Sequence, residues 1–265
     1  MMSRSLTSLS RSVEDQVVLI TGAGSGIGRS TAHLFSDNHS CVAVTDIEIE
    51  RVEKVVEEIT ENGGDAKGWK LDVTNVSEIK KVVEEVALWK AGNGHSIDIL
   101  INNAGASMPS TIDEPAMENL WQKGIELLLT SQMRLIRTSL PHLHKSESPR
   151  IINISSTEGI GGSAGASIYT AAKHGVVGLT RSLAVELGES GITVNAVGPG
   201  PIRTGITEAI PEDMKQKFAR RRVPVRRYAD PEEVAHAILN LALPSSSYIN
   251  GHLFMVDGGM SIKNN

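Results

Sequence analysis

The sequence predicts an α/β fold: a single doubly wound domain, with a parallel sheet of about seven strands and helices on both of its faces. Two observations support this prediction. Short apolar runs alternate with helical patterns along the whole chain, which is the order of successive β–α units. The apolar runs are continuous and not alternating, which is typical of parallel strands buried on both faces. No stretch of linker composition divides the chain, and no internal repeat is present.

The expected elements follow these runs in order. Helical periodicity predicts helices at 47–60 and 76–89. The segment 205–227 is also helical, but it is very basic and flanked by prolines, so we expect it to form a substrate lid. We expect residues 1–12 to form a disordered tail and residues 13–265 to form the domain. Strands are expected at 17–20, 41–45, 68–71, 97–101, 150–154, 192–197 and 253–256.

Composition is that of a globular protein with a substantial core, with 40% hydrophobic and 22% charged residues in 265. The net charge of −5 does not indicate a nucleic-acid or membrane partner. No apolar stretch approaches the ~20 residues that span a membrane. The single cysteine, Cys41, excludes an internal disulfide, and the histidines show no metal-ligand spacing. Residues 1–12 are serine-rich and lack acids, like a transit peptide, but they are short, so we expect a cytoplasmic protein.

A glycine-rich turn connects the first expected strand to the first helix. The run Val17-Val18-Leu19-Ile20 leads directly into Thr21-Gly22-Ala23-Gly24-Ser25-Gly26-Ile27-Gly28. Glycines permit a tight turn and a close approach of the main chain to a pyrophosphate, and a helix N-terminus offers free N–H groups and a positive dipole. This order of strand, turn and helix predicts a Rossmann-type nucleotide site. Its expected contacts are Gly22, Ser25, Gly26, Ile27 and Gly28.

An acidic residue ends the second expected strand: Asp46 lies 18 residues after Gly28. In a dinucleotide-binding fold, a carboxylate at this place accepts hydrogen bonds from the ribose hydroxyls and repels a 2′-phosphate. The alternative is that Asp46 only caps the next helix. No arginine or lysine lies between Gly22 and Gly28 to attract a 2′-phosphate. We therefore expect NAD and not NADP as the cofactor.

Two further strand ends carry polar or small residues. Asp72, which is followed by Val73, is placed where a carboxylate can contact the adenine amino group. The turn 102–105, with Asn102, Asn103, Ala104 and Gly105, allows the chain to pass close to a cofactor. Each pattern alone is equally consistent with a plain turn. Their position at the carboxyl ends of strands, where ligands bind in open α/β sheets, favours the cofactor.

The residues for proton transfer are expected after the fifth strand. Ser156 ends that strand, Tyr169 follows 13 residues later, and Lys173 lies four residues beyond Tyr169, on the same helix face. A free phenol has a pKa near 10, and a nearby ammonium favours the phenolate. Tyr169 can then accept a proton from an alcohol or donate one to a carbonyl, while Ser156 holds the substrate oxygen. The alternative is that the tyrosine and lysine are only surface residues.

Together these motifs resemble the short-chain dehydrogenase/reductase family, in its branch with a TGxxxGxG turn and a YxxxK pair, from about residue 13 to 260. The resemblance implies an NAD(P)-dependent oxidoreductase acting on CH–OH groups. The motifs that carry it are TGAGSGIG at 21–28, Asp46, Asp72-Val73, NNAG at 102–105, Ser156, YTAAK at 169–173, Asn195 and Pro199-Gly200-Pro201-Ile202-Arg203-Thr204.

The resemblance also implies roles that spacing alone does not. Lys173 is expected to bond the nicotinamide ribose, and the segment 199–204 to embrace the nicotinamide. A homotetramer with helices packed between subunits and a mobile lid at about 205–225 are implied as well. The full expected set of cofactor contacts is Gly22, Ser25, Gly26, Ile27, Gly28, Asp46, Ile47, Asp72, Val73, Asn102, Ala104, Gly105, Tyr169, Lys173, Pro199, Gly200, Ile202 and Thr204.

One residue departs from the family pattern. Family members usually carry an asparagine thirteen residues before the proline at Pro141, where it supports a water that relays protons from the lysine to solvent. Leu128 occupies that place here, and a leucine side chain neither donates nor accepts a hydrogen bond. We expect activity to be retained on Ser156, Tyr169 and Lys173, with water held in another way.

Beside the expected lid, five arginines have two possible roles. They can recognise a carboxylate or phosphate on the substrate, or they can serve subunit contacts and a solvated face, which we favour. Met214 and Phe218 can line an apolar part of the pocket or take part in ordinary helix packing. The arginines are Arg220, Arg221, Arg222, Arg226 and Arg227.

Three functions fit the sequence. We favour an NAD-dependent oxidoreductase that moves a hydride between a secondary alcohol or ketone and nicotinamide, with Tyr169 as general acid/base. The alternative is a reductase of 3-oxoacyl thioesters carried by acyl carrier protein or CoA, against which Asp46 counts. A further alternative is a cofactor-bound protein without catalysis, which Leu128 favours and the intact Ser156, Tyr169 and Lys173 oppose.

Overall fold

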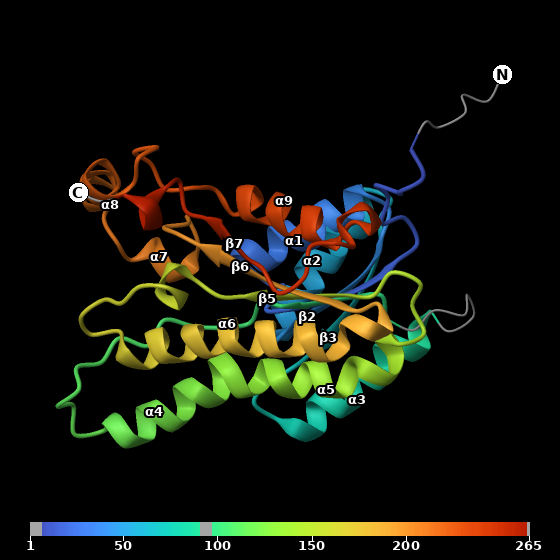
Figure 1. Ribbon diagram of the computed structural model, residues 1–265, viewed down its shortest axis with the longest axis horizontal. Coiled ribbons are helices and arrows are strands. Elements are labelled where there is room, and N and C mark those ends of the chain that lie inside the picture. Colours follow the sequence, from blue (N-terminus) through green and yellow to red (C-terminus); the bar gives the residue numbers. More distant parts are fainter. Residues whose placement is uncertain (1–6, 91–96, 264–265) are drawn as a thin grey trace.

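Seven parallel strands form the centre of the protein (Figure 1). The computed structural model describes residues 7–90 and 97–263. The strand order is β3-β2-β1-β4-β5-β6-β7, so the predicted doubly wound parallel sheet is confirmed. The strands are β1 (Val17–Thr21), β2 (Cys41–Asp46), β3 (Asp65–Lys70), β4 (Ile99–Asn102), β5 (Arg150–Ile154), β6 (Thr193–Pro199) and β7 (Leu253–Val256).

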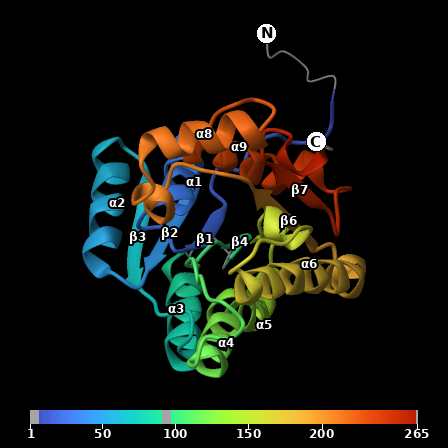
Figure 2. The ribbon, with the colours of Figure 1, turned by 90° about the vertical axis from the view of Figure 1, so that its left-hand side faces the viewer.

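Helices cover both faces of the sheet (Figure 2). α1, α2 and α9 pack on one face, and α3, α5 and α6 pack on the other. A π-helical turn, Glu126–Thr130, joins α4 to α5. The helices are α1 (Gly26–Asp37), α2 (Ile49–Glu61), α3 (Val76–Trp89), α4 (Met117–Ile125), α5 (Ser131–Leu143), α6 (Ser167–Leu187), α7 (Gly205–Glu208), α8 (Glu212–Arg222) and α9 (Pro231–Ala242).

Two hydrophobic cores explain why the apolar runs are continuous. In β1, Val18 and Ile20 belong to the core under α1 and α9, whereas Val17 and Leu19 belong to the core under α3 and α6. All four side chains are fully buried. Because successive residues of a strand point to opposite faces, a strand between two helical layers has no polar face.

The edge strand β3 is longer than the sequence predicts. The expected strand at 68–71 covers only the second half of β3, which begins at Asp65. Of the residues in β3 only Trp69 is buried, because β3 lies at the end of the sheet and pairs only with β2. An edge strand with exposed polar residues carries no apolar run, so its first half has no hydrophobic signal.

The carboxyl ends of β1, β4, β5 and β6 meet at one edge of the sheet. β1 lies between β2 and β4, so the chain reverses its direction of winding there, and open α/β sheets bind ligands at such a point. The expected lid segment 205–227 contains α7 and α8, which follow β6 at this edge (Figure 1).

Part of the expected N-terminal tail lies outside the described residues, which begin at residue 7. Residues 7–12 are exposed, and the carbonyl oxygen of Ser10 accepts a hydrogen bond from the Ser245 N–H at 2.9 Å. Across residues 7–90 and 97–263, no helix has the length and apolar character to cross a membrane. Over the same residues, no group of three or more His, Cys, Asp or Glu side chains is placed to hold a metal ion.

Candidate active site

The glycine-rich turn after β1 requires glycine at several positions. Gly22 and Gly26 have φ angles of +64° and +52°, which favour glycine. A Cβ atom on Gly28 would lie 2.2 Å from the Gly22 carbonyl oxygen. Ser25 gives α1 no side-chain cap, and the first helical hydrogen bond runs from Arg29 N to Ser25 O at 3.1 Å. The N–H groups that precede it are free of helical partners and can hold an anion.

Asn103, which is not among the expected cofactor contacts, holds this turn in place. Its side-chain amide donates to the carbonyl oxygens of Thr21 at 2.9 Å and Gly22 at 3.0 Å. The Thr21 hydroxyl accepts in return from the N–H groups of Asn103 and Ala104. The neighbouring Asn102 was expected to contact the cofactor, but its side chain is 1% exposed and donates to Asn153 across the sheet at 2.8 Å.

Successive side chains along β4 point to opposite faces of the sheet, so the two adjacent asparagines have different surroundings. Asn102 continues the face of Leu100, and Asn103 points the other way, toward the glycine-rich turn. Gly105, further along this segment, faces the π-helical turn: a Cβ atom on it would lie 3.1 Å from Cδ2 of Leu128.

Asp46 closes β2 beside the glycine-rich turn. Its side chain is 9% exposed, with Oδ2 accepting from Gly24 N at 3.0 Å and Oδ1 accepting from Glu48 N at 3.2 Å. Each oxygen keeps a second lone pair, so both the cofactor contact and the local cap can exist together. Ile47, beside it, is 55% exposed. Arg51 also lies here, with its Cβ 2.7 Å from the place of a Cβ on Gly24, and it pairs with Glu48 at 2.8 Å.

Asp72 and Val73 follow β3, as the sequence predicts. Oδ1 of Asp72 accepts hydrogen bonds from the N–H of Thr74 at 2.8 Å and from the Thr74 hydroxyl at 2.7 Å. The carboxylate therefore shapes the turn before α3, and its second oxygen stays available. Val73 is buried, so only its backbone and one side of its side chain can face a ligand.

Ser156, Tyr169 and Lys173 come together at the carboxyl end of β5. Ser156 follows β5, and Tyr169 and Lys173 lie in the first two turns of α6. The side chain of Ser156 lies near the Tyr169 phenol and lowers the pKa of that group. The ammonium of Lys173 is buried, lies 5.4 Å from the centroid of the Tyr169 ring, and donates to the Ile154 carbonyl oxygen at 2.7 Å.

The electrostatics of Tyr169 differ from the sequence expectation. Burial raises the pKa of Tyr169, the hydrogen bond with Ser156 lowers it, and the nearby Glu158 carboxylate raises it. Burial also lowers the pKa of Lys173 to about 8. The expected lowering of the tyrosine pKa by Lys173 is therefore not found in the protein alone, because desolvation of the phenolate dominates.

The segment after β6 lies against the start of α1 in space. Gly200 is packed so closely that a Cβ atom on it would lie 2.8 Å from Cα of Asp257. Ile202 is buried. Thr204 forms a capping box with Thr207 at the start of α7, and its Cγ2 lies 3.2 Å from the place of a Cβ on Gly26. The beginning of the lid thus contacts the glycine-rich turn.

Leu128 lies in the π-helical turn and is fully buried. Its carbonyl oxygen accepts from the side-chain amide of Gln132 at 3.3 Å. Within the described residues, Oε1 of Gln132 has no hydrogen-bond partner. Leu128 therefore faces Gly105 without offering a polar side chain, and the Gln132 amide lies about one helical turn further along.

The five arginines at the end of α8 and directly after it differ in their partners. Arg227 forms a bidentate ion pair with Glu233, at 2.6 and 2.7 Å, which ties the end of the lid to α9. The other four arginines are exposed. Met214 and Phe218 are 55% and 38% exposed, and Phe218 packs edge-on against Tyr228, with 6.1 Å between the ring centroids.

Known proteins resemble this chain over nearly its whole length. A family model described as enoyl-(acyl carrier protein) reductase matches residues 22–261. The chain is 39% identical over 250 residues to 3-oxoacyl-(acyl-carrier-protein) reductase FabG of Thermotoga maritima, covering 94% of this chain and 99% of that protein.

Solved structures share the fold. A 7α-hydroxysteroid dehydrogenase complexed with NADH and 7-oxoglycochenodeoxycholic acid superposes with a TM-score of 0.88 at 31% identity, covering 96% of this chain and 98% of that one. A Beutenbergia cavernae protein, assigned as an NAD(P)-dependent gluconate 5-dehydrogenase and holding NADP at low occupancy, gives the same TM-score and identity, with 96% and 99% covered. The chain therefore belongs to the short-chain dehydrogenase/reductase family.

Proposed function

We propose that this protein is an NAD(H)-dependent oxidoreductase that interconverts a secondary alcohol and its ketone. One observation carries the proposal: the Tyr169 phenol lies beside the buried Lys173, whose ammonium is 5.4 Å from its ring centroid, and near Ser156, at the sheet edge that also carries the glycine-rich turn. A positioned proton donor next to a dinucleotide site is the arrangement that carbonyl reduction needs.

The residues fit a nicotinamide dinucleotide. Gly26 and Gly28 let the turn pack closely against Thr204 and the Gly22 carbonyl, and α1 begins there without a side-chain cap. Gly22, Gly26 and Ile27 would hold the diphosphate through backbone groups, and Asp46 would hold the adenosine ribose. When bound, the nicotinamide accepts or supplies the hydride. Asp46 supports NAD, since a carboxylate repels a 2′-phosphate.

The proton moves between Tyr169 and the substrate oxygen. In reduction, the Tyr169 hydroxyl gives its proton to the carbonyl oxygen as a hydride reaches the carbon; in oxidation, the phenolate takes the proton from the alcohol. Ser156 positions that oxygen through its hydroxyl. Because burial raises the pKa of Tyr169, the neutral phenol is the resting form of the protein alone. This form is ready to donate a proton, and positive charge near the ring is needed before it can accept one.

A second function has support from the relatives. The similar protein from Thermotoga maritima is a 3-oxoacyl-(acyl-carrier-protein) reductase, so reduction of a 3-oxoacyl thioester is the alternative. It needs the same Tyr169 proton donor and differs in the substrate and the preferred cofactor. The further alternative of a cofactor-bound protein without catalysis rests only on Leu128.

We also propose that the site residues named from the sequence are the cofactor contacts.

We further propose a homotetramer, with subunit contacts through α4, α5 and α6. These three helices lie together on one side of the sheet (Figure 2). Each exposes a large apolar side chain: Trp121 is 39% exposed, Met133 38% and Val185 85%. Exposed apolar residues gathered on one side are typical of a subunit interface. The cytoplasmic location stays a prediction.

A substrate panel with a matched pair of variants tests the proposal. The purified protein is incubated with secondary alcohols, ketones and 3-oxoacyl-CoA, and NADH and NADPH are followed by absorbance. Tyr169→Phe is expected to lower kcat by about 10²–10⁴-fold and to leave NADH binding unchanged. Tyr248→Phe, at a fully exposed tyrosine, should behave as the wild type. Equal activity of the two variants would remove Tyr169 from the mechanism.

A further inference from the structure

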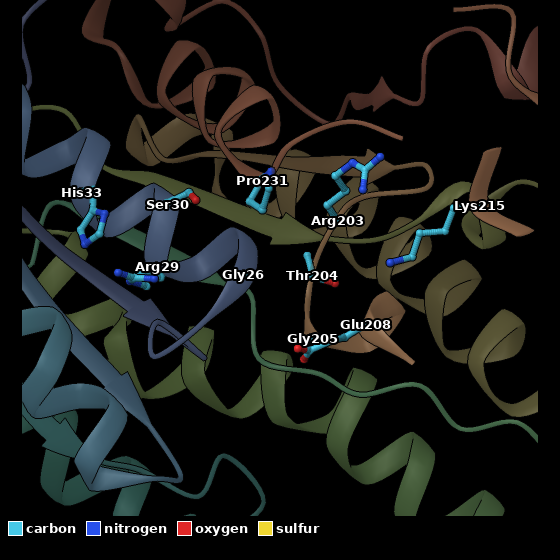
Figure 3. Close-up of a pocket in the computed structure, with 10 residues that line it drawn as sticks. All are labelled: Gly26, Arg29, Ser30, His33, Arg203, Thr204, Gly205, Glu208, Lys215 and Pro231. Atoms are coloured by element: carbon cyan, nitrogen blue, oxygen red, sulfur yellow. The ribbon is translucent and has the colours of Figure 1, made fainter. Parts of the chain in front are cut away.

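A cavity of about 530 Å³ opens between α1 and the lid (Figure 3). Gly26, at the start of α1, and Thr204, at the start of the lid, lie in its wall. Ser156, Tyr169 and Lys173 do not line it. The cavity therefore adjoins the turn expected to hold the diphosphate, and the three residues of proton transfer are not part of its wall.

Most of the cationic side chains of this cavity are already paired. Arg29 bonds Glu58 through Nε at 2.9 Å and through a second nitrogen, and His33 lies 3.0 Å from the same carboxylate. Arg203 binds both carboxylate oxygens of Glu212, at 2.9 and 2.7 Å. These bidentate pairs hold their guanidinium groups in place and balance their charge.

Lys215, on α8, is different. Within the described residues, no hydrogen bond or ion pair engages its ammonium, although the side chain is half-buried. Its charge helps to lower the pKa of Glu212, but Arg203 already binds both oxygens of that carboxylate. It extends from the lid helix toward Thr204 and Gly205 (Figure 3). The carboxylate of Glu208 also lines the cavity but makes no ion pair with Lys215. A half-buried ammonium that makes no hydrogen bond or ion pair, opposite the uncapped start of α1, can attract an anion.

We propose that Lys215 binds the diphosphate of the dinucleotide from the lid side, opposite the backbone N–H groups of the glycine-rich turn. This inference rests on the proposed function, because it needs a dinucleotide in the site. The diphosphate is then held between α1 and α8. Its negative charge attracts both the Lys215 ammonium on the lid and the N–H groups of the glycine-rich turn. Lys215 thereby couples cofactor binding to the position of the lid.

Binding measurements separate this role from catalysis. NADH is titrated into the wild type and into Lys215→Gln, Lys215→Arg and Lys217→Gln, followed by cofactor fluorescence. ADP and adenosine are then used as competitors, because only ADP carries a diphosphate. Lys217 is the matched control, since it lies two residues along the same helix, is exposed, and pairs with Asp213 at 3.0 Å.

Lys215→Gln is expected to weaken NADH and ADP by about tenfold, the scale of one charge-assisted contact, and to leave adenosine unchanged. Lys215→Arg should retain most of the affinity, and Lys217→Gln all of it. Unchanged NADH and ADP affinities in Lys215→Gln would overturn this inference and leave the proposed function standing. A wild type that binds neither NADH nor ADP would overturn both this inference and the proposed function.

Discussion

The side-chain amide of Asn103 donates to the carbonyl oxygen of Gly22 at 3.0 Å, so the turn after β4 holds the glycine-rich turn after β1 in shape. Asn103 also donates to the Thr21 carbonyl, which makes it a bridge between two central strands. Its role is to position the backbone groups that are expected to contact the cofactor.

Replacing Asn103 by alanine should therefore affect both stability and binding. Loss of the two hydrogen bonds leaves partly buried carbonyl groups without donors, and we expect the free energy of unfolding to fall by about 1–3 kcal/mol. NADH binding should weaken as well, because the turn is no longer held. Denaturant unfolding and NADH titration measure the two effects. Asn62→Ala, at an exposed helix end, is the control and should change neither. An Asn103→Ala protein with wild-type NADH affinity would contradict the positioning role.

The charge of Glu158 should set the pH dependence of the reaction. This carboxylate raises the pKa of Tyr169, so Glu158→Gln should lower that pKa. Oxidation needs the phenolate and rises with pH, so its rising limb should move to lower pH. Reduction needs the phenol, so its falling limb should move in the same direction. Profiles of kcat/KM in both directions test this, with Glu186→Gln on the exposed face of α6 as the control. A shift to higher pH would contradict the assignment.

Leu128→Asn should not increase the rate by more than about threefold. The proton transfer itself uses Ser156, Tyr169 and Lys173, none of which depends on a side chain at this position. The variant should instead lose about 1–3 kcal/mol of stability, because an amide replaces a fully buried leucine. Initial rates and thermal unfolding are the measurements, and Leu128→Ala gives the cost of the cavity alone. A gain in kcat of tenfold or more would show that leucine limits turnover in the native protein.

Asp46 should determine which dinucleotide binds. The wild type is expected to bind NADH more tightly than NADPH. Asp46→Ser should reduce this preference at least about tenfold, because it removes a negative charge from the place of the 2′-phosphate. Arg51, which packs against Gly24, should then favour NADPH, so Arg51→Gln in the Asp46→Ser background should weaken NADPH only. Asp37→Ser, at the far end of α1, is the control. Tighter NADPH binding by the wild type would overturn the prediction of NAD.

Features that follow from periodicity and spacing could be predicted from the sequence. β5 and α3 have the expected boundaries, because a buried strand and an amphipathic helix leave a hydrophobic pattern in the chain, and β7 has them because all four of its residues are apolar. The Tyr169–Lys173 pair could also be placed, since residues four apart share a helix face. The beginning of β3 could not be placed, because Asp65, Ala66 and Lys67 form no apolar run.

Properties that depend on three-dimensional surroundings were not predictable. The pKa of Tyr169 depends on how deeply the ring is buried, and this depth comes from the packing of the whole domain. The roles of Asn102 and Asn103 depend on which face of the sheet each one meets. Lys215 lies among many basic residues in the sequence, and only the fold separates it from the arginines that have carboxylate partners.

β1 carries apolar side chains into two cores, so hydrophobicity does not distinguish its two faces. For a strand of this kind, a shift by one residue would leave every buried position apolar, and the hydrophobic effect alone specifies the alignment weakly. The hydrogen bonds from the backbone of Asn103 and Ala104 to the Thr21 hydroxyl act only in the native alignment. The residues that shape the nucleotide turn thus also specify the register of the central strands, so selection for cofactor binding and selection for correct folding act on the same contacts.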